Sequence, residues 1–182
     1  MSRSWQKRFW NVAVDGSSGL PATVGRFVRR IAPSVAVLLV VLVCAAPAQA
    51  RALLPAEQSL FDALNSARIT RGVRPLRVDW ELRAAARAHS AEMLRRDYFG
   101  HGDFSWRMGH YGVEGPAFGE NLAWGVGSAA GAQAVVRMWL ASPAHRAILL
   151  RAGFRRVGVA APLGEFLGYA GARVITVDFA GR

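Results

Sequence analysis

The chain has 182 residues, which is enough for one ordinary domain and a short additional segment. Hydrophobic residues make up 52% of it, so the chain can bury a core and lacks the composition of a disordered protein. The formal net charge is +11, but the arginines are scattered and form no basic stripe with interleaved aromatic residues. We therefore expect no nucleic-acid binding, and at most a weak attraction to anionic envelope polymers or lipid surfaces.

Residues 1–50 have the organisation of a secretory signal sequence. Three arginines within residues 26–30 precede an almost continuous apolar run over residues 31–43, and Ala48-Gln49-Ala50 supplies small residues for cleavage after Ala50. The apolar run of about 13 residues is short for a membrane span, which takes roughly 20 residues. We expect a secreted, periplasmic or cell-envelope protein with no integral membrane span after processing. A retained N-terminal anchor is the alternative.

Cleavage after Ala50 would leave a domain of residues 51–182 without cysteine, because Cys44 is the only cysteine in the chain. Such a domain has no disulfide, no thiol nucleophile and no thiolate metal ligand. It carries 17 basic and 11 acidic residues, a formal charge of about +6, and every basic residue is an arginine. The arginines are densest at Arg95-Arg96 and Arg155-Arg156.

The first half of this domain predicts two helices. Apolar residues recur at three- and four-residue spacing over residues 55–71, and Gly72 follows where a left-handed residue commonly ends a helix. Asp79 is a suitable N-cap for a second helix that runs to about Asp97. The spacing of its apolar residues places His89 on the apolar face of this second helix.

The second half predicts short helices and then strands. We expect a turn of helix near residues 105–111, a strand over 121–125, a helix capped by Ser128, a helix that starts at Ser142-Pro143 and ends at Gly153, and adjacent antiparallel strands over 157–161 and 173–179. Helices followed by strands in this order predict an α+β domain with helices packed on an antiparallel sheet.

Common catalytic motifs do not occur in the sequence. No pair of its four histidines has the spacing that places two metal ligands on one helical face, and there is no nucleophile elbow, Walker loop or dinucleotide-binding glycine fingerprint. Local motifs alone therefore predict only an exported α+β domain.

Six short blocks of sequence stand out along the predicted domain. They are Leu64-Asn65-Ser66-Ala67-Arg68, Gly72-Val73-Arg74-Pro75-Leu76, His89-Ser90-Ala91-Glu92-Met93, Tyr98-Phe99-Gly100-His101, Gly119-Glu120-Asn121-Leu122-Ala123 and Trp139-Leu140-Ala141-Ser142-Pro143-Ala144-His145-Arg146. In this order they resemble the blocks of bacterial CAP (SCP) domains, whose superfamily includes cysteine-rich secretory proteins, antigen 5 and plant pathogenesis-related proteins. Each block is weak evidence by itself, but the ordered set covers roughly residues 55–179.

The resemblance implies a three-layer α-β-α sandwich with a central polar cleft, in which two histidines and two glutamates of many family members hold a divalent metal, often zinc. His101 and Glu120 match two of these positions, whereas Ser142 and Val174 replace the second glutamate and the second histidine. His145 matches a histidine typical of the bacterial branch and would bring the zinc ligands to three, enough for an open zinc site. The predicted cleft residues are His101, Glu120, Asn121, Ser142 and His145, and the candidate Zn²⁺ ligands are His101, Glu120 and His145.

Each candidate also has a purely structural interpretation. His89 is expected to be a buried, hydrogen-bonded core group rather than a ligand. Glu120 can accept hydrogen bonds from backbone amides, and Ser142 can cap the helix that follows it. His145 can simply pack in the first turn of that helix, and Asn121 can brace a loop.

Three functions remain open from the sequence. The first is a secreted binding module whose cleft holds a metal ion or a small polar or lipid ligand; the resemblance implies sterol and lipid binding for some family members. The second is a zinc-assisted, peptidase-like hydrolase in which Glu120 or His145 activates water. The third is a cell-envelope structural or interaction protein that acts through its arginine-bearing surface. The lack of a recognisable nucleophile and base pair favours the binding module.

Overall fold

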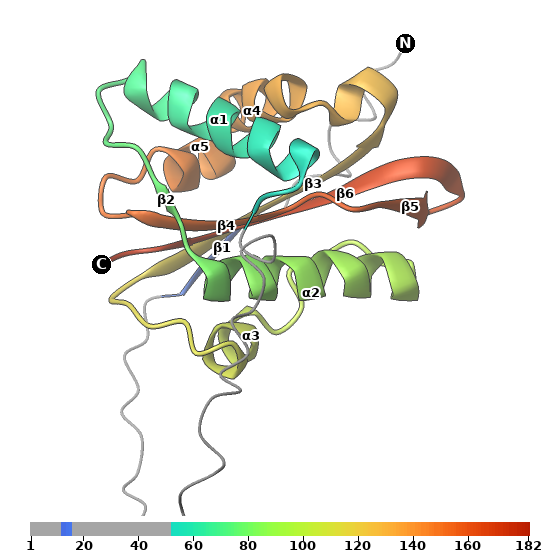
Figure 1. Cartoon of the computed structure of the whole chain (residues 1–182), viewed down its shortest axis with the longest axis horizontal. Helices are drawn as coiled ribbons and strands as arrows, with labels where there is room; N and C mark the ends of the chain where they lie inside the picture. The colour runs from blue at the N-terminus through green and yellow to red at the C-terminus, as the bar shows by residue number, and fades with distance from the viewer. Residues whose placement is uncertain (1–11, 16–51) are drawn as a thin grey trace, which may run out of the picture. The chain divides into compact units, whose positions relative to one another are not determined.

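The structure is a computed structural model that describes residues 12–15 and 52–182 (Figure 1). The predicted cleavage site after Ala50 lies outside the described residues, as does the predicted signal sequence apart from residues 12–15. Within the described parts of the chain, no helix is long and apolar enough to cross a membrane.

A single six-stranded sheet forms the middle layer of the domain. Its strands are joined in the order β1-β3-β6-β4-β2, and β5 pairs with β6 outside this path. Every pairing is antiparallel except the short parallel pairing of β2 with β4. The strands are β1 (Val12–Asp15), β2 (Arg77–Val78), β3 (Phe118–Val126), β4 (Arg156–Ala160), β5 (Leu163–Phe166) and β6 (Tyr169–Ala180).

The sheet confirms the predicted strands and extends them. Strands β4 and β6 are antiparallel neighbours, with Val157 opposite Phe179, as the sequence predicted. The predicted strand over residues 121–125 is the middle of β3, which pairs with β6 along its whole length. The sequence did not predict β5, because Leu163–Phe166 contains a glycine and a glutamate and no β-branched residue.

Helices cover both faces of this sheet (Figure 1). Helices α1 (Pro55–Ile69), α4 (Ala132–Ala141) and α5 (Pro143–Leu149) lie on one face, whereas α2 (Trp80–Arg96) and α3 (Phe104–His110) lie on the other. The largest apolar cluster fills the space between the sheet and helices α1, α4 and α5. Two smaller clusters lie on the side of α2 and α3. The predicted α+β, three-layer α-β-α architecture is confirmed.

Several helix ends lie where the sequence predicted them. The Asp79 carboxylate accepts a hydrogen bond from the Leu82 backbone N–H at 2.9 Å and caps α2, and the C-cap Asp97 is left-handed. Gly72 follows α1 with a φ of +70°, which suits a residue without Cβ.

Two predicted helix boundaries are wrong. Ser128 lies within a 3-10 turn, η3 (Gly127–Ala130), and α4 begins only after Gly131. Helix α5 ends at Leu149 rather than at Gly153. The buried Arg68 guanidinium donates to the Leu149 carbonyl oxygen at 2.6 Å, so the end of α5 finds its hydrogen-bond partner outside the helix.

Candidate functional site

Strand β3 directs two neighbouring polar side chains to opposite faces of the sheet. Successive side chains alternate along a strand, and both Glu120 and Asn121 are fully buried. Glu120 bonds Arg107 of α3, whereas Asn121 bonds the backbone of His145 in α5. Because α3 and α5 cover different faces, the domain has two separate polar clusters (Figure 1).

The first of these, the Glu120 cluster, consists of Glu120, His89, His101, Arg107 and Asp178. His101 Nδ1 lies 2.5 Å from Glu120 Oε1, and an Arg107 guanidinium nitrogen bonds Oε2. A second nitrogen of Arg107 donates to the His101 carbonyl oxygen at 3.0 Å. Arg107 therefore positions both the carboxylate and the loop that carries His101.

His89 contributes a neutral imidazole to this cluster. Its Nε2 lies 2.8 Å from the Gly100 carbonyl oxygen, which makes Nε2 the protonated nitrogen, and 3.9 Å from Glu120 Oε2. Burial, followed by the positive charge of Arg107, lowers the pKa of His89 to about 3. The prediction that His89 is a buried, hydrogen-bonded core group is confirmed.

Asp178 adds a second buried carboxyl group. It stands opposite Glu120 in the register of β6 with β3 and is fully buried, and among the described residues no donor reaches its carboxylate oxygens. Burial and the charge of Glu120 raise the pKa of Asp178 well above its usual range. Burial also raises the pKa of Glu120 to about 7, although Arg107 opposes this effect. The two carboxyl groups therefore titrate as one coupled pair, and burial favours their protonated forms.

Arg107 and Asp178 were missed by the sequence analysis. Asp178 did carry a signal, because it is the only charged residue within the apolar stretch 174–180 of a predicted strand. Arg107 carried none, since nothing in its local sequence shows that a residue of a short helix will be buried against β3.

The second cluster joins the remaining predicted cleft residues on the other face of the sheet. Asn121 Nδ2 donates to the His145 carbonyl oxygen at 3.1 Å, and the Ser142 hydroxyl lies 2.7 Å from His145 Nδ1. Ser142 is the N-cap residue of α5, as predicted, but its hydroxyl makes no hydrogen bond to the helix backbone. These contacts fasten the start of α5 to β3. Contrary to the prediction, His145 does not join His101 and Glu120 in one cleft.

The contacts of the Glu120 cluster do not fit the predicted zinc site. Both Glu120 oxygens are already engaged, one by His101 and one by Arg107, and the guanidinium group would repel a divalent cation. The third candidate ligand, His145, is on the far side of the sheet. In the parts of the chain that the structure describes, no three His, Cys, Asp or Glu side chains form a group that could hold a metal. Zinc binding stays a prediction from the resemblance, and this geometry does not favour it.

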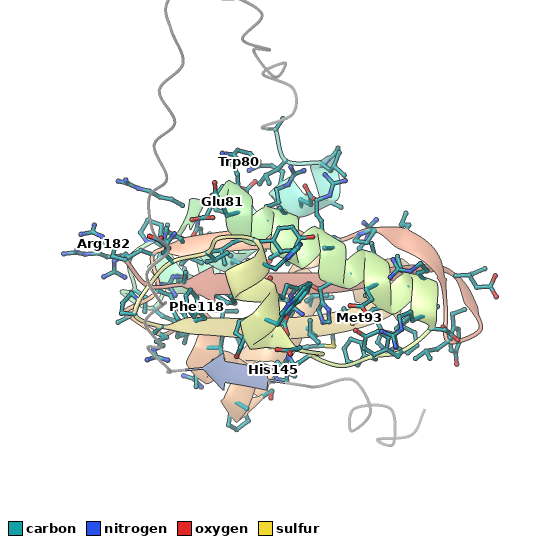
Figure 2. All side chains as sticks on the ribbon, turned by 90° about the horizontal axis from the view of Figure 1, so that it is seen from below. Trp80, Glu81, Met93, Phe118, His145 and Arg182 are labelled. Carbon is teal, nitrogen blue, oxygen red and sulfur yellow. The ribbon has the colours of Figure 1, made fainter. Side chains whose placement is uncertain are left out.

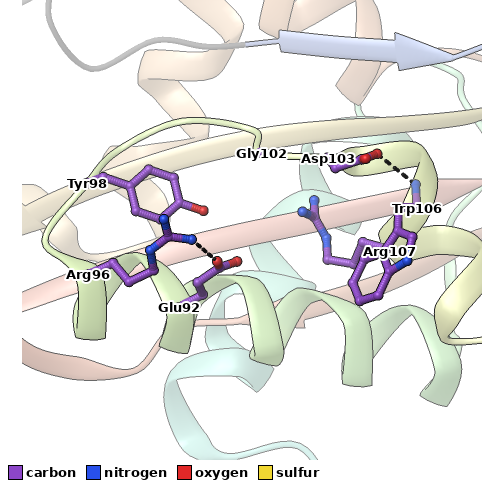
Figure 3. Close-up of a pocket in the computed structure, with 7 residues that line it drawn as sticks. All are labelled: Glu92, Arg96, Tyr98, Gly102, Asp103, Trp106 and Arg107. Carbon is purple, nitrogen blue, oxygen red and sulfur yellow. Dashed lines mark hydrogen bonds and ion pairs between the residues drawn. The ribbon is translucent and has the colours of Figure 1, made fainter.

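A cavity of about 420 Å³ lies beside the Glu120 cluster (Figure 3). Arg107 belongs to both, since it lines the cavity and holds Glu120. Gly102 lets the backbone pass close to Tyr98 and His89. A Cβ at this position would lie 3.4 Å from the Tyr98 hydroxyl and 3.5 Å from the His89 ring. The lining residues are Glu92, Arg96, Tyr98, Gly102, Asp103, Trp106 and Arg107.

The charged groups of this wall are paired within the protein. Arg96 donates to the Glu92 carboxylate at 2.8 Å, and Asp103 accepts from the Trp106 backbone N–H at 2.9 Å and caps α3 (Figure 3). The Trp106 side chain is 62% exposed and stacks on the ring of His110, which is also exposed. The cavity thus combines an exposed aromatic ring with polar groups, and both of its arginines are paired with carboxylates.

Comparisons with known proteins agree on one family. The family model described as CAP, the cysteine-rich secretory protein family, matches residues 61–179. The uncharacterized protein YkwD from Bacillus subtilis (strain 168) is 31% identical over 108 residues, which cover 57% of this chain and 41% of YkwD. The chain therefore spans about two fifths of the length of this relative.

Solved structures of similar fold include two from other bacteria. An extracellular protein containing a SCP domain from Bacillus anthracis str. Ames has a TM-score of 0.58 and 26% identity, over 72% of this chain and 45% of its own. An outer surface protein from Borrelia burgdorferi has a TM-score of 0.59 and 20% identity, over 69% of this chain and 91% of its own. The second likeness concerns the fold alone.

Proposed function

Because the chain belongs to the CAP family of cysteine-rich secretory proteins, we propose that it is a binding module of extracellular type that takes a small polar ligand in the cavity beside the Glu120 cluster. The description of the Bacillus anthracis relative as an extracellular protein supports secretion or attachment to the cell envelope. The observation that carries the proposal is the double role of Arg107 in the cavity wall and in the Glu120 cluster.

Arg107 presents a pre-organised donor to a ligand in this cavity. One side of its guanidinium group is fixed by the buried Glu120 carboxylate and by the His101 carbonyl oxygen. Burying two carboxyl groups and an arginine costs stability, and such groups with shifted pKa values gather at functional sites more often than elsewhere. A ligand can therefore bind Arg107 without the loss of side-chain entropy that a free arginine would suffer.

The wall chemistry favours an uncharged ligand rich in hydroxyl or amide groups. Glu92 and Arg96 neutralise each other, Arg107 is paired with Glu120, and Asp103 is used as a helix cap. An anionic ligand would find no unpaired arginine there. Trp106 offers an apolar ring face to the flat side of such a ligand. A lipid ligand has less support, because four of the seven lining residues are charged.

The test is an NMR titration of the chain with the neutral trisaccharide tri-N-acetylchitotriose, followed through backbone amide shifts. We expect the largest shifts in residues 98–107, and a Trp106→Ala variant should bind about tenfold more weakly because it loses the ring contact. Leu163→Ala is the control, since Leu163 is 60% exposed and lies outside the cavity. A parallel titration with dodecylphosphocholine tests the lipid alternative. Saccharide binding with no shifts in residues 98–107 would place the ligand elsewhere and end the proposal.

A zinc-assisted hydrolase is less well supported, because its three candidate metal ligands do not converge. Calorimetric titration of the chain and of Glu120→Gln with zinc addresses this function directly. Stoichiometric binding that is lost in the variant would revive it.

A further inference from the structure

A second cavity, of about 550 Å³, lies where β2 and β4 begin and shares no lining residue with the cavity beside the Glu120 cluster. The parallel pairing of β2 with β4 places Arg77 next to Arg156 in neighbouring strands. Figure 2 shows Arg182 projecting outward at one end of the molecule. We call this cavity the arginine hollow; its lining residues are Arg74, Pro75, Arg77, Val78, Arg155, Arg156 and Arg182.

Two of its five arginines hold the wall in place. Arg156 pairs with Asp79 at 2.8 Å and donates through Nε to the Gly181 carbonyl oxygen at 3.1 Å. Arg155 donates to the carbonyl oxygen of Phe154 at 2.9 Å. Reversing the charge at Arg155 or Arg156 would therefore disturb the fold as well as any surface interaction.

The buried side chain of Arg68 links the two chain segments that form the hollow. Arg68 donates through Nε to the Arg74 carbonyl oxygen at 2.9 Å and through Nη2 to the Phe154 carbonyl oxygen at 3.1 Å. Burial, followed by the positive charge of Arg155, lowers the pKa of Arg68 to about 10. The backbone of the hollow is thus fixed, and another cationic group lies behind it.

The other three guanidinium groups are available. The side chains of Arg74, Arg77 and Arg182 are exposed and make no hydrogen bond or ion pair with any residue that the structure describes. Asp79 neutralises Arg156, and no acidic residue belongs to the lining itself. The positive charges of the three free arginines of the hollow are therefore uncompensated.

Phosphate matches this arrangement better than a carboxylate does. Guanidinium groups bind both anions through paired N–H donors, but a carboxylate offers two oxygens and one negative charge. A phosphate group offers more oxygens and up to two negative charges, which three arginines can share. The lining has no aromatic ring on which a nucleic-acid base could stack.

We propose that the arginine hollow binds a phosphate group, carried either by a polyol-phosphate polymer of the cell envelope or by a lipid headgroup. This site is independent of the ligand proposed for the cavity beside the Glu120 cluster. The sequence suggested a weak attraction of the whole surface to anionic partners. The proposal locates this attraction in the arginine hollow.

The experiment measures binding of the full chain to three probes: glycerol 3-phosphate, a soluble poly(glycerol phosphate), and phosphatidylcholine vesicles with or without phosphatidylglycerol. The test variant is Arg74→Gln/Arg77→Gln, which removes two free guanidinium groups without breaking a contact to any described residue. The matched control is Arg95→Gln/Arg137→Gln, which removes the same charge from exposed positions outside the hollow. We expect about tenfold weaker binding in the test variant and less than about twofold weakening in the control.

The pattern across the probes identifies the source of the phosphate. Binding to the two soluble probes supports a polymer, whereas binding only to vesicles that contain phosphatidylglycerol supports a lipid headgroup. Equal weakening in both variants would reduce the effect to overall charge and overturn the proposal, as would a wild-type chain that binds none of the probes.

Discussion

Asp178 and Glu120 place two carboxyl groups opposite each other in the interior of a sheet, and folding raises the pKa of both. Such a group binds its proton more tightly in the folded chain than in the unfolded chain. Its contribution to stability is therefore complete below the unfolded pKa, near about 4, and is lost as the pH rises through the folded pKa. For Glu120 this loss is centred at about pH 7.

His89 acts in the opposite sense at acid pH. Because folding lowers its pKa to about 3, the unfolded chain takes up the proton first, and stability falls as the pH drops from about 6.5 toward 3. Above about pH 6.5 the His89 imidazole is neutral in both states, so it contributes nothing further to the slope.

We therefore predict that Asp178→Asn flattens the loss of stability that occurs as the pH rises through the raised pKa values of the carboxyl pair. The asparagine amide can donate to Glu120 as the protonated carboxyl does, but it cannot lose its proton. Urea unfolding at several pH values gives the free energy of unfolding directly. Glu165→Gln is the control, because Glu165 is exposed on β5. Parallel slopes for Asp178→Asn and the wild type would show that Asp178 does not contribute to the pH dependence of stability.

Helix α2 lies directly against β4 because residue 158 is a glycine. A Cβ at Gly158 would overlap the Leu82 carbonyl carbon and the Arg83 amide nitrogen, both of which belong to the helix backbone. Neither atom can move without shifting the helix, which carries His89 of the Glu120 cluster.

Gly158→Ala should consequently lower the free energy of unfolding by about 3 kcal/mol, through overpacking of a rigid contact. Gly153→Ala provides the comparison, since nothing lies within 4 Å of its Cβ position, and we expect a change within about 0.5 kcal/mol. Chemical denaturation of both variants measures the difference. Similar stability of the two would mean that α2 is not held this closely to the sheet.

Helix α1 is joined to the end of α5 by one buried side chain. Arg68 donates to the carbonyl oxygens of Leu149, Phe154 and Arg74, at 2.6, 3.1 and 2.9 Å. Replacing it leaves these carbonyl groups without their donor in the interior.

Arg68→Met should cost about 3 kcal/mol of unfolding free energy, because its apolar side chain fills the space but donates nothing. Arg71→Met, one turn along at an exposed position, should change it by less than about 0.5 kcal/mol. The thermal midpoints of the two variants provide the measurement. A small effect of Arg68→Met would show that water satisfies these carbonyl groups instead.

At the scale of the whole molecule, strand β1 connects the predicted signal sequence to the domain. Residues Val12–Asp15 pair antiparallel with residues 118–121 of β3. If processing removes residues 1–50, this edge of β3 loses its partner strand.

We predict faster hydrogen exchange of backbone amides in residues 118–121 in a chain that begins at Arg51 than in the full chain. The amides of β6, which lies on the other side of β3, serve as the internal reference. Equal exchange of residues 118–121 in the two chains would show that β1 does not protect this edge.

The sequence by itself determined the local elements and the family. Apolar periodicity and capping residues such as Asp79 predicted α1 and α2, because these signals act within one or two helical turns. The ordered blocks predicted the CAP fold, and they pointed to His101 and Glu120, which are in contact. The start of α4 and the end of α5 were less predictable, and the end of α5 depends on a bond to distant Arg68.

Only the tertiary structure decided the composition of the site. The alternation of side chains along β3 sends Glu120 and Asn121 to opposite faces, and it thereby separates His145 from His101. The register of β6 against β3 places Asp178 opposite Glu120, and the packing of α3 brings Arg107 to the same carboxylate. Such contacts depend on strand pairing and layer packing between residues far apart in the chain, for which no local pattern exists.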